Sequence, residues 1–552
     1  MRKIFTMITF IEHPIVSEKC DHYEIMVNGK KANAVKTRVS AMPFNRPWPG
    51  KQRSLEQTEI TAYLPLFTDE QSLEFTITPA VKFKSVVIRP ISAGIFPQIK
   101  EGSVHFTLPK TGYYTVEFDG PHNVLHLFID SIHHFDVSEN DDSVYYFGPG
   151  VHNVGELRVK SGTTVYIHRN AVVYGSILGV NVKNIKILGE GVLDGSFYER
   201  KTDDFLLGYD YSRVPEASWG KQKKKKKKKK NICNENFNCF TNISNYQKGS
   251  GTYIYHDDVQ FDKLLETMHP VKTGISLYAS ENIEVTGIII RNCAGLSVTQ
   301  AECRNIHYKN VKLIGMWRYN SDGIDFYNCQ NCSVRNSFLR TFDDTICVKG
   351  QVGWDTVNSS DIHIEECVLW NDWGHTLDIG VDTVAPEIRN IVFRNCDLIH
   401  NTAAAIDVGN ADRAHIHNIL FEDLRIEFSH YDLAPVLQSD DETVFTPKNQ
   451  PPALIKMFLT CGVWSIDNMY GNIENVIFKD IAVISDESDF NSTIYLEGYN
   501  REHGIKNVIF ENISHNGKPL LTPDALNIKS NEFVDFMVLY KSNEENENME
   551  LR

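Results

Sequence analysis

The stretch that decides the fold begins with Asn282-Ile283-Glu284-Val285, and related stretches recur along the second half of the chain. The eight copies read NIEVTGI from 282, NIHYKNV from 305, NCSVRNS from 331, DIHIEEC from 361, NIVFRNC from 390, NILFEDL from 418, NVIFKDI from 475 and NVIFENI from 507. Their starts are 23, 26, 30, 29, 28, 57 and 32 residues apart. A period of this size, with β-branched strands and no helical pattern, indicates a parallel β-helix with one coil per repeat.

Two positions of each repeat have a physical role. The first is Asn or Asp, whose side chain tolerates left-handed geometry and hydrogen-bonds to nearby backbone, so we expect a sharp turn there. Stacked coils would align these amides into a ladder. The sixth residue after it predicts an inward row in which Cys acts as a small hydrophobe. That row is Ile288, Val311, Ser337, Cys367, Cys396, Leu424, Ile481 and Ile513.

The first part of the chain has a different pattern of short alternating segments. Asn28-Gly29 predicts a hairpin turn, and residues 112–118 and 124–129 read as strands. We therefore predict an all-β protein with an N-terminal antiparallel β-sandwich at 1–145 and a parallel β-helix domain at 146–540. Residues 541–552 form a polar tail.

One segment of the helix domain breaks the repeat. No coil can be traced through about 196–268, and eight consecutive lysines, Lys223–Lys230, lie within it. We interpret it as a low-complexity surface insertion. A basic tether for polyanions and a homopolymer artefact in the encoding DNA are the alternatives.

Charge and hydropathy exclude two classes of function. The chain has 56 basic and 71 acidic residues, a net charge of −15, so a nucleic-acid backbone is not an expected partner. No apolar run reaches the length of a membrane helix, so no membrane partner is expected. Residues 4–11 read as an opening strand rather than a signal peptide, which favours the cytoplasm unless an upstream start is missing. The sequence gives no indication of oligomeric state.

The 11 cysteines are too sparse for a disulfide scaffold and, being odd in number, cannot all pair within the chain. Cys329 and Cys332 form one Cys-x-x-Cys, and no second such pair follows at zinc-site spacing. We therefore predict packing roles for several cysteines, and neither a metal nor a cofactor.

The densest polar residues fall on three successive coils, at 320–323, 341–344 and 373–376. Asp322 and Asp343 are 21 residues apart, close to one coil, so their carboxylates can converge. Asp is common in β-helix turns, but the adjacent pair Asp343-Asp344 is unfavourable without a task. Crowded acids push their pKa values apart, and cleavage of a glycosidic bond needs one protonated and one ionised carboxyl.

Aromatic residues surround these coils and suggest a sugar-binding cleft. Trp317, Tyr319 and Trp373 are the candidates for stacking on sugar rings. Capping of the core beneath loops is the alternative for each of them.

These motifs resemble those of glycoside hydrolase family 28, the polygalacturonase-like enzymes with a right-handed parallel β-helix. The family's Asn-Thr-Asp, Gly-Asp-Asp and Gly-His-Gly correspond to 320–322, 342–344 and 374–376 here, and the similarity extends over about 146–520. The N-terminal sandwich is similar to that of the dextranase-like family 49.

The resemblance implies a role for each matching residue. Asp343 would be the general acid, Asp322 and Asp344 would activate water, and His375 would support the acid. Asn320 and Lys349 would bind substrate, and the anomeric configuration would invert.

The chain departs from the family at one motif. The Arg-Ile-Lys that grips a substrate carboxylate is Ala405-Ile406-Asp407 here. We therefore expect Asp407 to accept hydrogen bonds from the hydroxyls of a neutral sugar.

The predicted function is an inverting glycoside hydrolase acting on a carbohydrate. A polysaccharide lyase on the same fold and a non-catalytic glycan-binding β-helix are the alternatives. A lyase would use calcium and a basic residue, whereas this cluster is acidic. A binding protein would have no need for three converging carboxylates.

Overall fold

The computed structural model describes residues 8–41, 58–196, 274–318, 320–351, 354–431, 452–460, 469–486 and 492–540. Tyr319, the Lys223–Lys230 run, the tail at 541–552 and nearly all of the predicted insertion lie outside this part of the chain. The described residues contain strands and two short 3-10 helices, η1 (Val16–Glu18) and η3 (Ile91–Ala93). None of the described helices is long and apolar enough to cross a membrane.

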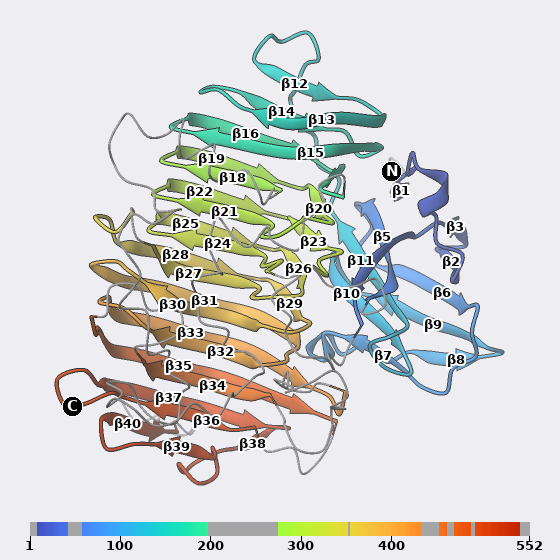
Figure 1. Cartoon of the computed structure of the whole chain (residues 1–552). Coiled ribbons are helices and arrows are strands. Elements are labelled where there is room, and N and C mark those ends of the chain that lie inside the picture. Colours follow the sequence, from blue (N-terminus) through green and yellow to red (C-terminus); the bar gives the residue numbers. More distant parts are fainter. Residues whose placement is uncertain are drawn as a thin grey trace, which may run out of the picture.

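The N-terminal region folds into two small sheets (Figure 1). One contains β1 (Ile8–Phe10), β4 (Val35–Ser40), β5 (Thr58–Thr68), β7 (Val86–Arg89), β10 (Gly112–Phe118) and β11 (Val124–Asp130). The other contains β2 (Tyr23–Val27), β3 (Lys30–Ala32), β6 (Leu73–Pro79), β8 (Gln98–Lys100) and β9 (Ser103–Leu108). Buried side chains of both sheets form one core.

The local predictions for this region are confirmed. Asn28 and Gly29 both have positive φ and connect the antiparallel strands β2 and β3. The strands predicted at 112–118 and 124–129 are β10 and β11, which pair antiparallel. One pairing differs, because β11 runs parallel to β5. Local alternation predicts strands but carries no information about such a distant partner.

The other described strands form one sheet of 29 strands coiled into a β-helix, and its pairings are parallel except for that of β37 with β38, which confirms the predicted fold class. Its strands before the 197–273 gap are β12 (Val144–Phe147), β13 (Gly150–Arg158), β14 (Thr164–Ile167), β15 (Ala171–Val180), β16 (Lys183–Gly189) and β17 (Val192–Asp194). The middle strands are β18 (Ile275–Tyr278), β19 (Glu281–Thr286), β20 (Ile289–Arg291), β21 (Val298–Ala301), β22 (Arg304–Lys309), β23 (Lys312–Ile314), β24 (Ile324–Tyr327), β25 (Gln330–Arg335), β26 (Phe338–Thr341), β27 (Ile346–Gly350), β28 (Ser359–Glu365), β29 (Val368–Asn371) and β30 (His375–Thr383). The last strands are β31 (Glu387–His400), β32 (Ala404–Asn410), β33 (His415–Phe428), β34 (Ala453–Leu459), β35 (Asn472–Ser485), β36 (Ile494–Glu497), β37 (Ile505–His515), β38 (Lys518–Pro519), β39 (Ile528–Ser530) and β40 (Val534–Leu539).

The repeat residues hold the coils together as expected. Asn305 donates to Asn282 over 2.8 Å, and Asn331 donates to Asn305 over 2.6 Å, so the predicted amide ladder is present. The leading Asn or Asp of each repeat has positive φ. Every member of the predicted inward row is at most 3% exposed. Ser337 is the polar member of the row, and its hydroxyl donates to the backbone carbonyl of Arg335. Cys367 and Cys396 are therefore packing residues.

The N-terminal sheets lie against the side of the β-helix near β20, β23, β26 and β29 (Figure 1). A mixed core that includes Tyr113, Phe128, Phe338 and Trp370 joins the two units. A buried ion pair between Lys312 Nζ and Asp130 Oδ2, 2.8 Å apart, links them as well. The N-terminal unit is thus packed firmly on the domain that carries the polar turns.

Candidate active site

The three predicted polar turns stack on one face of the β-helix. Each lies just before or at the start of one of the neighbouring parallel strands β24, β27 and β30. The N–H of Gly323 donates to the carbonyl of Asp344 over 2.8 Å, and the N–H of Thr345 donates to the carbonyl of His375 over 2.8 Å. These bonds between coils place Asp322, Asp344 and His375 one above another.

His375 bridges two carboxylates. Its Nδ1 lies 2.9 Å from Asp344 Oδ1, and its Nε2 lies 3.5 Å from Asp407 Oδ2. Burial alone would raise the pKa of Asp344, but the charge and hydrogen bonds of His375, together with the charge of Lys349, hold it below its ordinary value. Burial lowers the pKa of His375, but the charges of Asp407 and Asp344 more than compensate and raise it. An ionised Asp344 and a protonated His375 therefore support each other.

The pKa of the neighbouring Asp343 is shifted in the opposite direction. Burial and then the negative charge of Asp344 raise the pKa of Asp343 to about 7. Two side chains hold the backbone of this turn in place, because Thr341 Oγ1 and Asn371 Nδ2 both donate to the carbonyl of Asp343, over 2.7 and 2.8 Å. Two adjacent carboxyls thus differ in protonation, as acid/base chemistry requires.

Lys349 lies among carboxylates. Its Nζ is 3.4 Å from Asp322 Oδ2, 3.4 Å from Asp325 Oδ1 and 3.7 Å from Asp344 Oδ2, and its side chain is 8% exposed. The predicted substrate-binding lysine therefore offers its charge to three protein acids. Burial, followed by the charge of Asp325, still raises the pKa of Asp322 well above its ordinary value.

Three acids of the site were not among the predicted residues: Asp325, Asp378 and Asp382. Parallel register places Asp325, Cys347, Asp378 and Asp407 side by side on β24, β27, β30 and β32. Burial, and then the charges of Asp344 and Asp407, raise the pKa of Asp378 well above its usual range. Burial raises the pKa of Asp382 to about 6. Asp325, Asp378 and Asp382 belong to no local sequence motif. The alignment of Asp325 and Asp378 with Asp407 is revealed only by the pairing of the strands.

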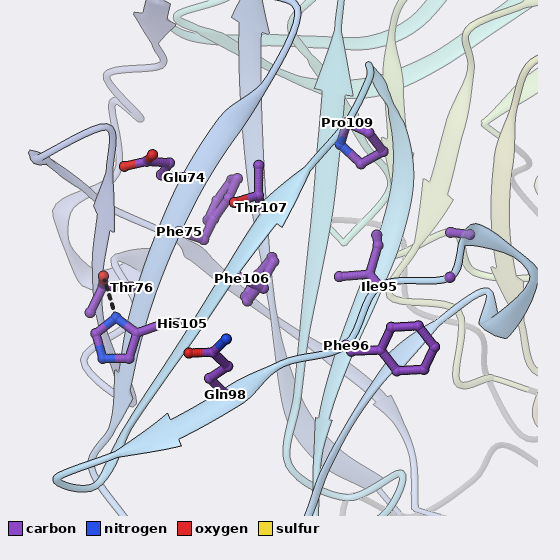
Figure 2. Close-up of a pocket in the computed structure, with 12 residues that line it drawn as sticks. Glu74, Phe75, Thr76, Ile95, Phe96, Gln98, His105, Phe106, Thr107 and Pro109 are labelled. Carbon is purple, nitrogen blue, oxygen red and sulfur yellow. Dashed lines mark hydrogen bonds between the residues drawn. The ribbon is translucent and has the colours of Figure 1, made fainter.

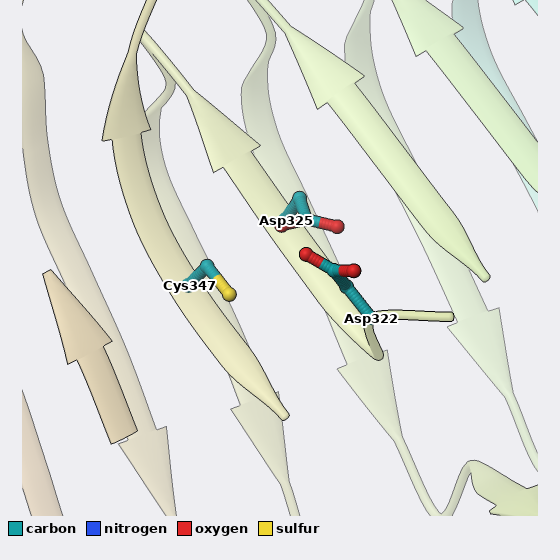
Figure 3. Close-up of side chains that lie close together, drawn as sticks. All are labelled: Asp322, Asp325 and Cys347. Carbon is teal, nitrogen blue, oxygen red and sulfur yellow. The ribbon is translucent and has the colours of Figure 1, made fainter. Parts of the chain in front are cut away.

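Two groups of side chains have metal-ligand spacing, namely Asp322, Asp325 and Cys347 (Figure 3), and Asp344, Cys347 and Asp378. The donor atoms of each group lie within 4.8 Å of one another. Burial raises the pKa of the Cys347 thiol well above its ordinary value, and a neutral thiol is a poor ligand for hard cations. The Lys349 ammonium already neutralises part of the acidic charge, so these donors fit a metal ion poorly.

Gly374 is required by the site. A Cβ on this residue would lie 2.6 Å from Asp344 Oδ1 and 2.7 Å from Asp343 Oδ1. Any side chain would therefore displace both carboxylates. This explains why glycine precedes His375 in the third turn.

The predicted aromatic ligands are mostly enclosed. Trp317 and Trp373 are each 8% exposed, and Trp373 stacks on Phe342 with ring centroids 5.5 Å apart. Asn320 is buried and has a positive φ of 49°. Tyr319 lies outside the described residues. The two tryptophans therefore expose little ring surface, and Trp373 packs on Phe342 of the second polar turn.

Comparisons with known proteins give a family match to part of the chain. The family described as "Glycosyl hydrolases family 28" matches residues 220–440. Polygalacturonase QRT2 of Arabidopsis thaliana is 25% identical over 157 residues, which span 28% of this chain and 34% of that relative. The chain thus aligns with about a third of that protein's length.

The chain was also compared with solved structures, one of which shares its fold at a TM-score above 0.5. Dex49A from Penicillium minioluteum superposes with a TM-score of 0.56 at 13% identity, covering 96% of both chains. An exopolygalacturonase from Thermotoga maritima has a TM-score of 0.44 and 15% identity, covering 71% of this chain and 83% of its own. The Dex49A superposition includes the N-terminal sheets as well as the β-helix. Residues 220–440, which include the turns at 320–322, 342–344 and 374–376, are thus similar to the glycosyl hydrolases of family 28, and the described part of the chain has a parallel β-helix.

Proposed function

We propose that this protein is a glycoside hydrolase that cleaves O-glycosidic bonds by general acid/base catalysis with inversion. The observation that carries the proposal is the pair Asp343 and Asp344, of which only Asp344 contacts His375 and Lys349, so that their pKa values are shifted in opposite directions. The match of residues 220–440 to glycosyl hydrolases supports it.

In the proposed reaction Asp343 gives its proton to the leaving glycosidic oxygen while the bond from that oxygen to the anomeric carbon breaks. A water molecule attacks the same carbon from the opposite face and loses its proton to the ionised Asp344. Direct attack by water inverts the anomeric configuration and forms no covalent intermediate. The next cycle begins after proton exchange with solvent restores both carboxyls.

The charge states refine the part played by Asp322. Its raised pKa favours the neutral form, so we assign removal of the water proton to Asp344 and orientation of the water to Asp322. His375 and Lys349 are positioning residues, because their charges keep Asp344 ionised without contact to the reacting atoms.

We further propose that the sugar beside Asp407 is neutral. This position has Ala405 and Asp407 where the related enzymes carry cations, and Lys349 is engaged with Asp322 and Asp325. A uronate would meet Asp344, Asp378 and Asp407. The cations beside them are His375 and Lys456, which lies opposite Asp407 on β34, and the charges of both already act on Asp407. A further carboxylate that finds no partner is costly to bury. Carboxyl groups bond well to sugar hydroxyls, whatever their protonation.

The test is to incubate the full-length protein with neutral plant, microbial and host oligosaccharides and, separately, with polygalacturonate. We expect turnover of a neutral substrate, and proton NMR of fresh product should show the opposite anomer. A retained anomer would contradict the water mechanism. Products absorbing in the ultraviolet would indicate a lyase, and binding without turnover would indicate a glycan-binding protein. Efficient cleavage of polygalacturonate alone would overturn the neutral-sugar proposal.

A further inference from the structure

A pocket of about 580 Å³ lies in the N-terminal sandwich rather than on the β-helix (Figure 2). Strands β6 and β9 form one side, and the segment from Ala93 to Gln98, which leads into the edge strand β8, forms the other. Phe75 and Phe106 are buried in the core of the sandwich, where they stack with ring centroids 5.2 Å apart and an interplanar angle of 1°. Side chains alternate along a strand, so Glu74, Thr76, His105 and Thr107 lie on the other face, and the stacked pair makes the wall formed by β6 and β9 rigid.

Phe96 stands at the rim of this pocket. Its side chain is 87% exposed, the most of any large apolar residue in the described part of the chain. An exposed ring is unfavourable in water, because burial of its apolar area would release free energy. Figure 2 shows the Phe96 ring on one side and Thr76 and His105 on the other. A ligand held between them would cover the exposed ring face.

Polar side chains line the pocket opposite Phe96. His105 Nδ1 lies 3.1 Å from Thr76 Oγ1, which fixes the orientation of the imidazole. Gln98, Thr107 and Glu74 are exposed around it and supply an amide, a hydroxyl and a carboxylate. These groups offer both donors and acceptors to a ligand with many hydroxyls.

The charge of the lining excludes most other ligands. Glu74 is the one Asp or Glu among the twelve lining residues, and no Lys or Arg is present. Phosphates, uronates and acidic peptides would find no cation here. An uncharged ligand with apolar ring faces and equatorial hydroxyls satisfies both the exposed ring and the polar rim.

We infer that this pocket is a second saccharide-binding site, which takes a neutral sugar chain by stacking one ring on Phe96 and hydrogen-bonding its hydroxyls to Gln98 and His105. The inference rests on the proposed function in that the same neutral polymer would reach both sites. The pocket would hold a polysaccharide while the carboxylates of the β-helix act on it.

The test uses the full chain with Asp343→Asn, so that oligosaccharides remain intact during measurement. Calorimetric titration with neutral gluco-, xylo-, manno- and galacto-oligosaccharides should show binding that Phe96→Ala weakens on the order of tenfold. Gln98→Ala should also weaken it. The matched control is Tyr145→Ala, which removes an exposed ring from β12 outside the pocket and should change nothing. Melting temperatures should stay equal in all three variants.

A second measurement separates this inference from the proposed function. With an active chain, Phe96→Ala should raise KM for a long polymer and leave kcat and the hydrolysis of short oligosaccharides unchanged. If no substrate is hydrolysed but Phe96-dependent sugar binding persists, the pocket inference stands and the proposed function fails. The inference would be overturned if Phe96→Ala leaves the affinity for every neutral oligosaccharide unchanged, or if no neutral sugar binds. Self-association that Phe96→Ala abolishes would overturn it in favour of a second copy as the occupant.

Discussion

His375 contacts Asp344 twice, because its ring Nδ1 and its backbone nitrogen each lie 2.9 Å from Asp344 Oδ1. One carboxylate oxygen therefore receives two bonds from a single residue of the next coil. This contact keeps Asp344 charged, and the charge of Asp344 helps to keep its neighbour Asp343 protonated. The stack of coils thus creates two chemical roles from two identical side chains.

Replacing the general acid should stop turnover. Asp343→Asn keeps the shape of the side chain but removes its transferable proton, so we expect kcat to fall by about 10² to 10⁴-fold. The dissociation constant for substrate and the melting temperature should change little. Hydrolysis close to the wild-type rate would exclude Asp343 as the acid.

The pH dependence follows from the two carboxyls. Asp343 must be protonated, and its pKa is about 7, so the rate should hold below that pH and fall as the pH rises through it. Asp344 must be ionised, and its pKa lies below the ordinary value, so the rate should persist well into acid. A profile of kcat/KM against pH measures both limbs. A limb on the alkaline side that lies several units away from 7 would contradict the assignment.

Removing the imidazole of His375 should shift the acidic side of the pH profile of kcat/KM to higher pH. In His375→Ala the largest source of stabilisation for ionised Asp344 is lost, so the pKa of Asp344 should rise. As the pH is lowered, the variant should therefore lose activity at a higher pH than the wild type does. Asp407→Asn is the matched control, because it leaves the contact between His375 and Asp344 in place. The shift in the pH profile should be clearly smaller in the control. Equal profiles in the wild type and His375→Ala would show that Lys349 alone keeps Asp344 ionised.

A methyl group at Gly374 should disable the site. Its Cβ would lie within 2.7 Å of both carboxylates, so Gly374→Ala must displace them, and a misplacement near 1 Å costs on the order of 10²-fold in rate. Gly148→Ala is the control, since its Cβ would meet Tyr146 at an ordinary 3.5 Å. Steady-state kinetics should separate the two variants. Full activity in Gly374→Ala would mean that the turn can relax without cost.

The stacked rings of the core should carry much of the stability. Phe421 lies between Phe393 and Phe478, with ring centroids 4.8 and 5.0 Å away, and is fully buried. Phe421→Ala should lower the free energy of unfolding by about 3–5 kcal/mol, because it leaves a cavity in the ladder. Phe96→Ala, at an exposed position, should stay within about 0.5 kcal/mol. Urea midpoints of the two variants measure the difference, and equal midpoints would contradict this role.

The sequence alone determined the repeat and the polar turns. Asn282, Asn305 and Asn331 mark the coils because a residue in left-handed geometry recurs once per turn, and this signal is local. Asp322, Asp343, Asp344 and His375 were predicted because their turns form recognisable short motifs. Local periodicity was enough for these features, since each coil contacts only its neighbours.

The tertiary structure alone decided the register between coils and the burial of the acids. Asp325, Asp378 and Asp407 come together because their strands pair in one particular alignment, and a shift of one residue would turn them to the other face. The same alignment places Lys349 between Asp322 and Asp325, although its position in the motif suggested a ligand for substrate. The parallel pairing of β5 with β11 has the same origin. Protonation states depend on the distances between charges and on their removal from water, so the opposite states of Asp343 and Asp344 exist only once the coils are stacked.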